Sequence, residues 1–265
     1  SGDSQHIVIN AEALNAIVTG QIPLSQIGNV IQEHISRHYN ISGDSTTKPK
    51  QKTPANYNLA LDATITDKPL LHVVMPGLQS MDTIGIHATV DPNNLYLAAD
   101  APHIVYNNNS IDSARIRVNG ADSALTYTAS VERVSMPSLQ LWYTNASGRL
   151  QGQEITANVS IADSVRKQRF ALNASLLQKP NEQELQLRDG LVLNYKTWQV
   201  SQPNKIVFSK EGFYAQNFGF SNGNESININ STAQNANAPL NLNINNFLIS
   251  NITEIVQKDT LLANG

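Results

Sequence analysis

One pair of residues has the spacing of a metal site. His34 and His38 are four residues apart in a segment with helical periodicity, and Glu33 is adjacent. Residues at this spacing lie on the same side of a helix, so two imidazoles could reach one metal ion. Both histidines also fall within the apolar arc of that segment, and no third ligand can be identified. We therefore expect partly buried histidines that are satisfied by backbone or water, and no metal site.

Other catalytic chemistry lacks its usual residues. Acid/base and nucleophilic catalysis need titratable groups that are brought together, but the 6 His residues are scattered. Acidic residues mostly fall at turns, such as Asp163 between the predicted strands that end at Ile161 and begin near Phe170. The sequence has no Cys and no nucleophile-elbow, zinc-protease or phosphate-loop motif. We expect neither an enzyme nor a cofactor.

Binding chemistry is represented by aromatic and hydroxyl residues. Trp142 and Tyr143 could stack against a carbohydrate. Neighbours on a strand point to opposite faces, so at most one of them could serve such a platform. Asp-Ser/Thr-apolar triplets resemble an O-glycosylation site that one bacterial lineage uses on exported proteins. These triplets begin at Asp82, Asp112, Asp122, Asp163 and Asp259.

The composition indicates a neutral polar surface. Only 15% of the residues are charged and the net charge is −3, so no nucleic-acid partner is expected. Asn contributes 31 residues, which suggests a wet surface of amides and hydroxyls. The one basic cluster, 48–52, lies in a Ser/Thr/Pro-rich run that we interpret as a flexible loop, or alternatively as a patch for anionic headgroups. No apolar run is long enough for a membrane-spanning helix, and no signal peptide is recognised.

Segments in which every second residue is apolar recur from Tyr57 to Phe247. Side chains on a strand alternate between faces, so this period predicts strands with one apolar and one polar face. We expect roughly 16 to 20 short strands between two helices, separated by turn sequences such as Asn119-Gly120 and Ser147-Gly148. So many strands cannot lie in one flat sheet, because twist accumulates.

The fold class predicted from this pattern is mostly β. A sandwich or a closed barrel would bury the apolar side chains, but the repeated pattern has no defined end. It favours a long curled antiparallel or mixed sheet, folded lengthwise into a hydrophobic groove (β-taco-like), with two short amphipathic helices. The predicted lining residues are Leu59, Leu61, Ile65, Ile84, Ile86, Val90, Leu125, Leu141, Ile155, Val159, Ile161, Phe170, Leu172, Leu176, Leu191, Leu193, Ile206, Phe208, Phe218, Phe220, Ile227, Ile229, Leu240, Leu242 and Ile244.

The two helices are expected near the two ends of the chain. The first covers 25–39 with Ser25 as its N-cap, and the second covers 250–258. The side chains expected to face the groove are Ile27, Val30 and Ile31 in the first helix and Ile252, Ile255 and Val256 in the second. The predicted organisation is strands plus a helix at 1–41, a flexible loop at 42–56, a continuous β-groove at 57–247, and the second helix with a truncated continuation at 248–265. Because the pattern is cut at both ends, we expect an internal fragment of a longer protein.

The last quarter of the chain resembles TamB-like proteins of the AsmA-like, repeating β-groove superfamily. The resemblance is carried by Leu191-Val192-Leu193-Asn194-Tyr195-Lys196-x-Trp198, Asn204-Lys205-Ile206-Val207-Phe208, Asn217-Phe218, Pro239-Leu240-Asn241-Leu242, Asn246-Phe247, Ile252-Thr253-Glu254-Ile255-Val256 and Leu261-Leu262-Ala263-Asn264-Gly265. Residues 1–190 agree only through their strand rhythm and the first helix.

This resemblance implies a function that the residues alone do not. Such proteins are anchored in the inner membrane of Gram-negative bacteria and cross the periplasm as a β-groove that is thought to conduct phospholipid acyl chains. They work with an outer-membrane barrel of the barrel-assembly family. We therefore expect a periplasmic lipid conduit or scaffold that supports outer-membrane biogenesis, with anchor and barrel contacts outside this fragment. The alternatives are a non-enzymatic cell-surface adhesin or glycan-binding module, and a β-solenoid carbohydrate enzyme, for which paired carboxylates are missing.

Overall fold

The chain folds into one broad antiparallel β-sheet that is not closed into a barrel. The computed structural model describes residues 5–21, 24–38, 57–121 and 123–254. The helical elements are a 3-10 turn at Leu24–Gln26, α1 (Ile27–His38), α2 (Pro69–Val74) and α3 (Ser250–Thr253). The strands of the first part are β1 (Gln5–Asn10), β2 (Leu14–Gly20), β3 (Leu59–Ile65), β4 (Leu78–Met81), β5 (Ile84–Val90), β6 (Leu95–Tyr106), β7 (Asn109–Ala121), β8 (Ala124–Ser135), β9 (Gln140–Gln151), β10 (Glu154–Ala162) and β11 (Gln168–Gln178). Those of the second part are β12 (Glu182–Leu187), β13 (Leu191–Leu193), β14 (Lys196–Val200), β15 (Lys205–Ser209), β16 (Gly212–Gln216), β17 (Phe218–Asn222), β18 (Glu225–Ser231) and β19 (Leu240–Asn245).

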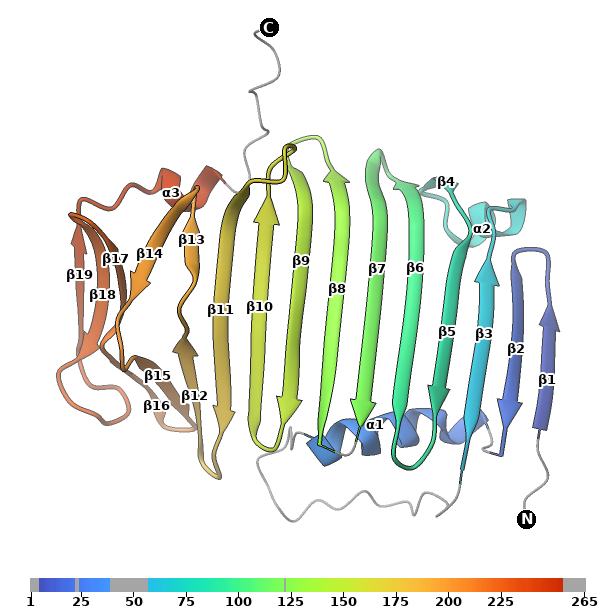
Figure 1. Ribbon diagram of the computed structural model, residues 1–265, viewed down its shortest axis with the longest axis horizontal. Coiled ribbons are helices and arrows are strands. Elements are labelled where there is room, and N and C mark those ends of the chain that lie inside the picture. Colours follow the sequence, from blue (N-terminus) through green and yellow to red (C-terminus); the bar gives the residue numbers. More distant parts are fainter. Residues whose placement is uncertain (1–4, 22–23, 39–56, 122, 255–265) are drawn as a thin grey trace, which may run out of the picture.

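The sheet is an up-and-down antiparallel meander, in which consecutive strands pair except where a strand is broken into two short pieces. In four places one line of the meander holds two short strands end to end, namely β4/β5, β12/β13, β14/β15 and β16/β17. Figure 1 shows β1 to β11 side by side as a single layer, with the broken strands at the other end of the sheet. A mostly β, curled sheet with short helices was predicted, and this prediction is confirmed.

The strand register places the apolar residues on one side of the sheet. Directly opposed residues of antiparallel strands point to the same face, and the opposed residues form three apolar rows across the strands. We call the surface made by these rows the apolar face. The first row contains Leu59, Val90, Leu95, Leu125, Leu150, Ile155, Leu176, Leu185 and Ile206. The second contains Ile7, Val18, Leu61, Ala88, Leu97, Val118, Tyr127, Ala157, Ala174 and Leu187, and the third Ile9, Ala16, Ala63, Ile86, Ala99, Ile116, Ala129, Ala146, Val159 and Leu172.

The opposite side, which we call the polar face, carries hydroxyl, amide and charged side chains in the same register. One of its rows contains Thr64, Asp100, Arg115, Ser130, Asn145 and Ser160, and the next contains Asp62, His87, Arg117, Thr128, Ser147, Asn158 and Asn173. The two-residue period of the sequence therefore separates the faces as predicted.

Two glycines that were expected in turns lie inside strands. Gly120 belongs to β7 and Gly148 to β9. A Cβ atom on Gly148 would come within 2.5 Å of the Tyr127 ring, so this glycine makes room for an aromatic side chain of the neighbouring strand. Close packing, rather than chain reversal, explains why glycine occupies this position.

Helix α1 closes one end of the apolar face. Figure 1 shows it running across the lower ends of the strands from β3 to β8. Val30 is fully buried, and it packs with residues of the first two rows, including Leu59 and Leu125. Ile27 and Ile35 join this core, whereas Ile31, which was predicted to do so, is 40% exposed. Around the helix Ile31 lies between Ile27 and Ile35, so the 3.6-residue period alone does not explain its exposure.

The N-terminal end of α1 also differs from the prediction. Ser25 was expected as the N-cap, but it lies within the 3-10 turn that precedes the helix. The predicted loop 42–56 and the last residues of the predicted second helix, including Ile255 and Val256, lie outside the described residues. In the described part of that helix, α3, Ile252 is exposed and Asn251 is buried. The Asn251 side chain donates a hydrogen bond to Glu225 at 2.8 Å, so a polar contact holds α3 where an apolar stripe was predicted.

A second core lies at the junction of the broken strands. Leu187, Leu191, Trp198 and Val200 are buried together, with Leu193, Phe218, Phe220 and Phe247 packed against them. The ring of Trp198 lies 5.5 Å from that of Phe220 and 5.4 Å from that of Phe247. Because Leu187 also belongs to the second apolar row, the apolar face continues into this core.

Asparagine side chains bridge the breaks between the short strands. Asn204 is buried, and its Oδ1 accepts a hydrogen bond from the backbone N–H of Leu187 at 2.9 Å. Its Nδ2 donates to the carbonyl oxygens of Leu187 and Ser201, and Asn217 donates to that of Pro203. These amides replace backbone hydrogen bonds that the broken strands cannot make. Part of the Asn-rich segment is therefore structural and not simply a wet surface.

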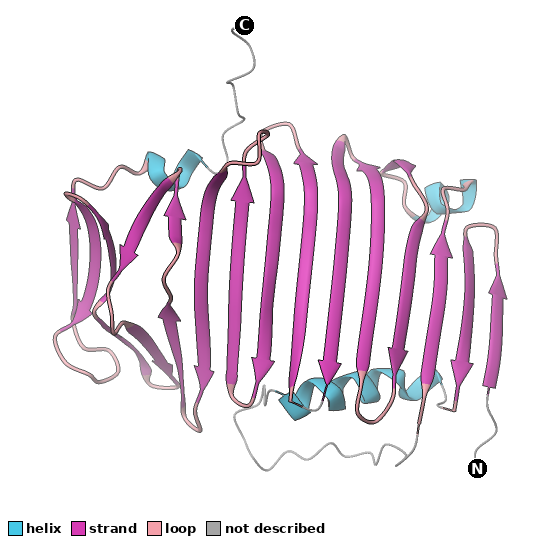
Figure 2. Cartoon of the chain, viewed as in Figure 1, coloured by secondary structure: helices cyan, strands magenta, loops and turns pink. Residues whose placement is uncertain are grey.

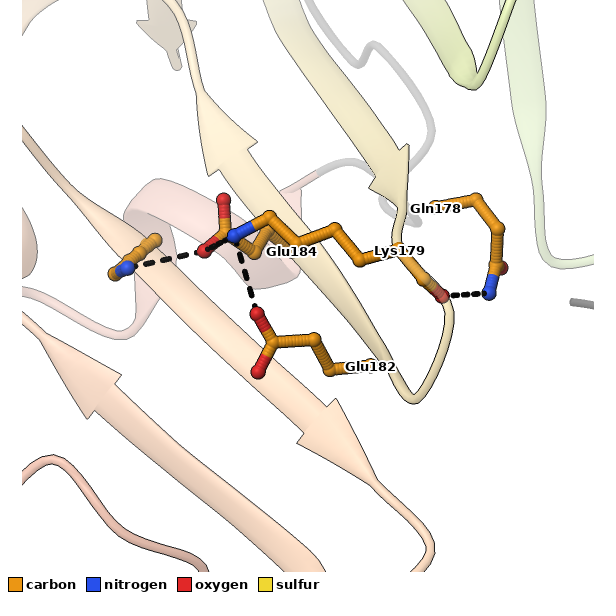
Figure 3. Close-up of polar contacts among 5 residues, drawn as sticks. Gln178, Lys179, Glu182 and Glu184 are labelled. Atoms are coloured by element: carbon orange, nitrogen blue, oxygen red, sulfur yellow. Dashed lines mark hydrogen bonds and ion pairs between the residues drawn. The ribbon is translucent and has the colours of Figure 1, made fainter.

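An ion network fixes the same region from the polar face. Figure 3 shows the ammonium group of Lys179 beside the carboxylates of Glu182 and Glu184. Lys179 donates to Glu184 at 2.6 Å, and Lys205 donates to the same carboxylate at 3.0 Å. Burial alone would raise the pKa of Glu184, but the two lysine hydrogen bonds outweigh it and hold this pKa below its usual value. The carboxylate is therefore ionised and joins β12 to β15.

Candidate functional site

The candidate site is the open middle of the apolar face. Beneath α1 the rows are closed, since Leu59, Val90 and Leu125 are only 8%, 6% and 5% exposed. In the third row, farther from α1, Ile116 is 47% and Leu172 43% exposed. The apolar face is thus buried in a core beneath α1, in its first row, and accessible in its third row. Figure 2 shows no second sheet over this part of β6 to β10.

The predicted lining residues fall into three groups. Buried in the two closed cores, and so unavailable to a ligand, are Leu59, Val90, Leu125 and Leu191, with Leu61, Leu193, Phe218 and Phe220 packed against them. In or beside the three rows across the middle are Ile65, Ile84, Ile86, Ile155, Val159, Ile161, Phe170, Leu172, Leu176 and Ile206. At the end of the sheet formed by the short strands and β19 are Phe208, Ile227, Ile229, Leu240, Leu242 and Ile244.

Leu141 is not part of the rows. It pairs with Val134 beyond a point where the pairing of β7 with β8 and of β8 with β9 is interrupted. Next to it the register aligns His103, Asp112 and Arg133. His103 hydrogen-bonds to Asp112 at 2.5 Å, and Arg133 forms an ion pair with the same carboxylate at 2.7 Å. Burial would raise the pKa of Asp112, but hydrogen bonds from His103 and Arg133 outweigh it and lower this pKa. The open apolar rows are thus bounded by α1 at one end and by this polar cluster at the other.

Several residues of the apolar face were missed from the sequence. Leu95, Leu97, Ile116 and Val118 lie in the rows, although none was predicted to line the groove. The alternation Leu95-Leu97-Ala99 could have revealed β6, and Ala114-Ile116-Val118 could have revealed β7. The arginines that alternate with Ile116 and Val118 lie on the polar face, so they do not interrupt the apolar one.

The middle of the face is shallow because its side chains are small. Alanines of β6 to β11 form much of the second and third rows, namely Ala99, Ala129, Ala146, Ala157 and Ala174. Tyr127 lies beside Gly148 in the second row, and its hydroxyl donates to the carbonyl oxygen of Thr156 at 3.3 Å. Such a surface has no reactive group. It can bind an apolar ligand by removing hydrocarbon surface from water.

The histidine considered as a metal ligand is part of the closed core. His34 is buried, and its Nε2 lies 2.7 Å from the carbonyl oxygen of Asp91 and 3.1 Å from the Tyr57 hydroxyl. The expectation that backbone satisfies this histidine is confirmed. The side chain of His38 lies outside the described residues. Within those residues, no three His, Asp or Glu side chains are grouped as a metal site would require.

Two hollows lie on the polar face rather than on the apolar one. One, of about 510 Å³, includes Ile17, Asp62, Gly85 and His87. The other, of about 520 Å³, includes Arg115, Ser130 and Asn145. Over the middle of the sheet, the third row of the apolar face is accessible to solvent.

Comparisons with known proteins do not place the chain in a family. No protein-family model, curated protein or solved structure matches it. None of the described helices has both the length and the apolar content needed to cross a membrane. The function therefore has to be argued from the geometry of the two faces.

Proposed function

We propose that the open apolar face binds phospholipid acyl chains and that the protein acts as a lipid conduit or scaffold. The observation that carries this proposal is the continuity of three apolar rows across the strands together with their accessibility in the middle. Aliphatic side chains of this size cost free energy when they face water, roughly 25 cal/mol for each Å². An exposed surface of this kind is typical of a binding site.

Acyl chains suit this surface better than a compact ligand does. The rows run perpendicular to the strands, which are about 4.8 Å apart, so a linear hydrocarbon can follow a row across several strands. Each methylene group that leaves water contributes about 0.8 kcal/mol when fully buried. An acyl chain on an open face is only partly buried, so each methylene group contributes part of this free energy. The total grows with the length of the acyl chain, which favours long ligands. No charged side chain occupies the three rows to oppose it.

The wider setting of this function follows from the resemblance of residues 190–265 to TamB-like proteins. We propose that the chain belongs to an inner-membrane-anchored protein of a Gram-negative bacterium. It acts in the periplasm, together with an outer-membrane barrel of the barrel-assembly family, and supports outer-membrane biogenesis. An adhesin built as a sandwich would instead close its apolar side chains between two sheets, and the single layer in Figure 2 favours the conduit.

The proposal predicts that a charge on the open face blocks lipid binding without unfolding the protein. Val159→Asp places a carboxylate in the third row, where an acyl chain could bind only by removing this charge from water. We expect the affinity for a fluorescent fatty acid, measured by anisotropy, to fall by at least about tenfold, the equivalent of roughly 1.4 kcal/mol.

Asn158→Asp is the matched control, because Asn158 is the neighbouring residue on β10 and lies on the polar face. This variant should bind the probe within about twofold of the unmodified chain, since its charge remains in water. Equal affinities for both variants would show that the probe does not use the apolar face.

A further inference from the structure

The hollow of about 520 Å³ on the polar face is lined by groups that recognise a polar, charged ligand. Ser130, Asn145 and Ser160 lie in one row on three neighbouring strands. They therefore present a hydroxyl, an amide and a second hydroxyl at steps of about 4.8 Å. Arg115 and Arg166 add two guanidinium groups to the lining, and Glu132 adds one carboxylate. This site lies on the opposite face of the sheet from the apolar rows, and a ligand there would bind independently of lipid.

Strained backbone positions converge on this hollow. Ser113, Tyr143 and Arg166 all line it, and their φ angles are 54°, 39° and 66°. Positive φ is uncommon for residues other than glycine, and it persists only where the surrounding structure enforces it. Ser113 and Tyr143 are inside β7 and β9, not in turns. The chain therefore carries side chains at positions where glycine would cost less.

The kink in β9 also changes where its aromatic residues point. Trp142 and Tyr143 were expected on opposite faces, but their ring centroids are only 6.3 Å apart. Regular alternation would separate them, and the positive φ of Tyr143 breaks that alternation. Tyr143 lies two residues from Asn145 and so lines the polar hollow by regular alternation, whereas the positive φ brings the Trp142 ring beside it.

The two arginines can accept an anionic partner. The Arg166 guanidinium lies over the Tyr143 ring at 4.2 Å, and its contact with Glu132 is 3.9 Å long. Stacking of this kind holds the planar guanidinium in place while its N–H groups remain able to donate. Arg115 lies 3.8 Å from Asp100, whose two oxygens Arg117 already holds at 2.7 and 2.8 Å. Neither arginine is thus committed to a short ion pair with these acids.

We propose that this hollow binds an acidic saccharide. A carboxylate or phosphate of the sugar pairs with Arg166 and Arg115, because guanidinium groups recognise such planar or tetrahedral anions through paired hydrogen bonds. The hydroxyl groups of the sugar hydrogen-bond to Ser130, Asn145 and Ser160. A neutral sugar lacks the charge that the two arginines select, and a small inorganic anion lacks the hydroxyl groups that the row of polar side chains selects.

Titration calorimetry with four probes tests this assignment. The probes are a trisaccharide of galacturonic acid, the neutral galactose trisaccharide, galactose 1-phosphate and inorganic phosphate. We expect one or both acidic sugars to bind at least about tenfold more tightly than the neutral sugar and inorganic phosphate. The acidic sugar that binds more tightly shows whether the charge is a carboxylate or a phosphate.

Variants connect the binding to the hollow. Arg166→Gln removes the stacked guanidinium and should weaken the acidic sugar at least about tenfold, whereas Ser130→Ala should weaken it about threefold to tenfold. Arg149→Gln is the control, because Arg149 is an exposed arginine of β9 that does not line the hollow. Circular dichroism of each variant checks the fold.

Several results would overturn the assignment. Equal affinity for the neutral trisaccharide would remove the role of charge. Equal affinity for inorganic phosphate would reduce the hollow to a simple anion site. Loss of affinity in Arg149→Gln as large as in Arg166→Gln, or no binding of either acidic sugar, would exclude the hollow as the site.

Discussion

Urea unfolding of the Val30→Asp variant is expected to show a loss of about 3 to 5 kcal/mol in the free energy of unfolding. Val30 is fully buried between α1 and the first two apolar rows. A carboxylate there would be surrounded by the aliphatic side chains of that core. Circular dichroism at the sheet and helix wavelengths measures the transition.

The informative comparison is with Val159→Asp in the open third row. Val159 is 38% exposed, so its replacement can keep the carboxylate in water and should cost less than about 1 kcal/mol. Gln32→Asp, at an exposed position of α1, controls for the effect of an added charge on the helix. If Val159→Asp destabilised the protein as much as Val30→Asp, the middle of the apolar face would be a closed core and not an accessible surface.

Removal of the charge on Glu184 is expected to have the second-largest effect. Glu184→Gln leaves Lys179 and Lys205 without the carboxylate that joins them. We expect a loss of roughly 1 to 3 kcal/mol at neutral pH, because a buried charge-assisted hydrogen-bond network would be only partly satisfied. Glu211→Gln, at an exposed position, should change the free energy of unfolding by less than about 0.5 kcal/mol.

The directions of the pKa shifts determine how the effect of Glu184→Gln on stability changes with pH. The pKa of Glu184 is lowered in the folded protein and that of Lys179 is raised, chiefly by its hydrogen bond to Glu184. The contribution of Glu184 is therefore complete above the unfolded pKa of about 4.3 and is lost as pH falls through the folded value. The contribution of Lys179 is complete below about pH 10.4 and is lost as pH rises through its folded value. The difference in the free energy of unfolding between Glu184→Gln and the unmodified chain should accordingly become smaller as the pH falls. An increase in this difference below about pH 4 would contradict this account.

The alternation in the sequence was sufficient to predict the two faces of the sheet. Leu61, Ile86, Val159 and Leu172 were assigned to one face from their spacing alone, and the register places them there. This works because a strand has a fixed period of two, so the face of each residue follows from its position. The same rule would have added Leu97 and its neighbours if it had been applied to β6.

Features that depend on contacts distant in the sequence could not be predicted. The position of α1 on the apolar face depends on contacts between segments that are distant in the sequence. Leu59 and Leu172 stand in the same alternating pattern, so the sequence does not show that the first is buried and the second exposed. The breaks near Asn204 and Asn217 have no periodic pattern, and their amides resemble those of a polar surface. The positive φ of Tyr143 is set by the neighbouring strands, and it moves an aromatic ring against the rule of alternation.

The polar hollow illustrates the same limit. Its polar side chains come from five neighbouring strands, β7 to β11, and from the turn after β10. In the sequence they are separate serines, asparagines and arginines among many others. Only the register shows that Ser130, Asn145 and Ser160 share one row.

Photo-crosslinking from two adjacent positions tests the central claim most directly. A photoreactive amino acid is placed at Val159 on the apolar face or at Asn158 on the polar face, and the protein is irradiated with phospholipid present. Mass spectrometry then measures the lipid adducts. Binding of acyl chains to the apolar face predicts adducts at position 159 and few or none at position 158. Equal labelling at both positions, or no adduct at position 159 in a folded protein, would contradict it.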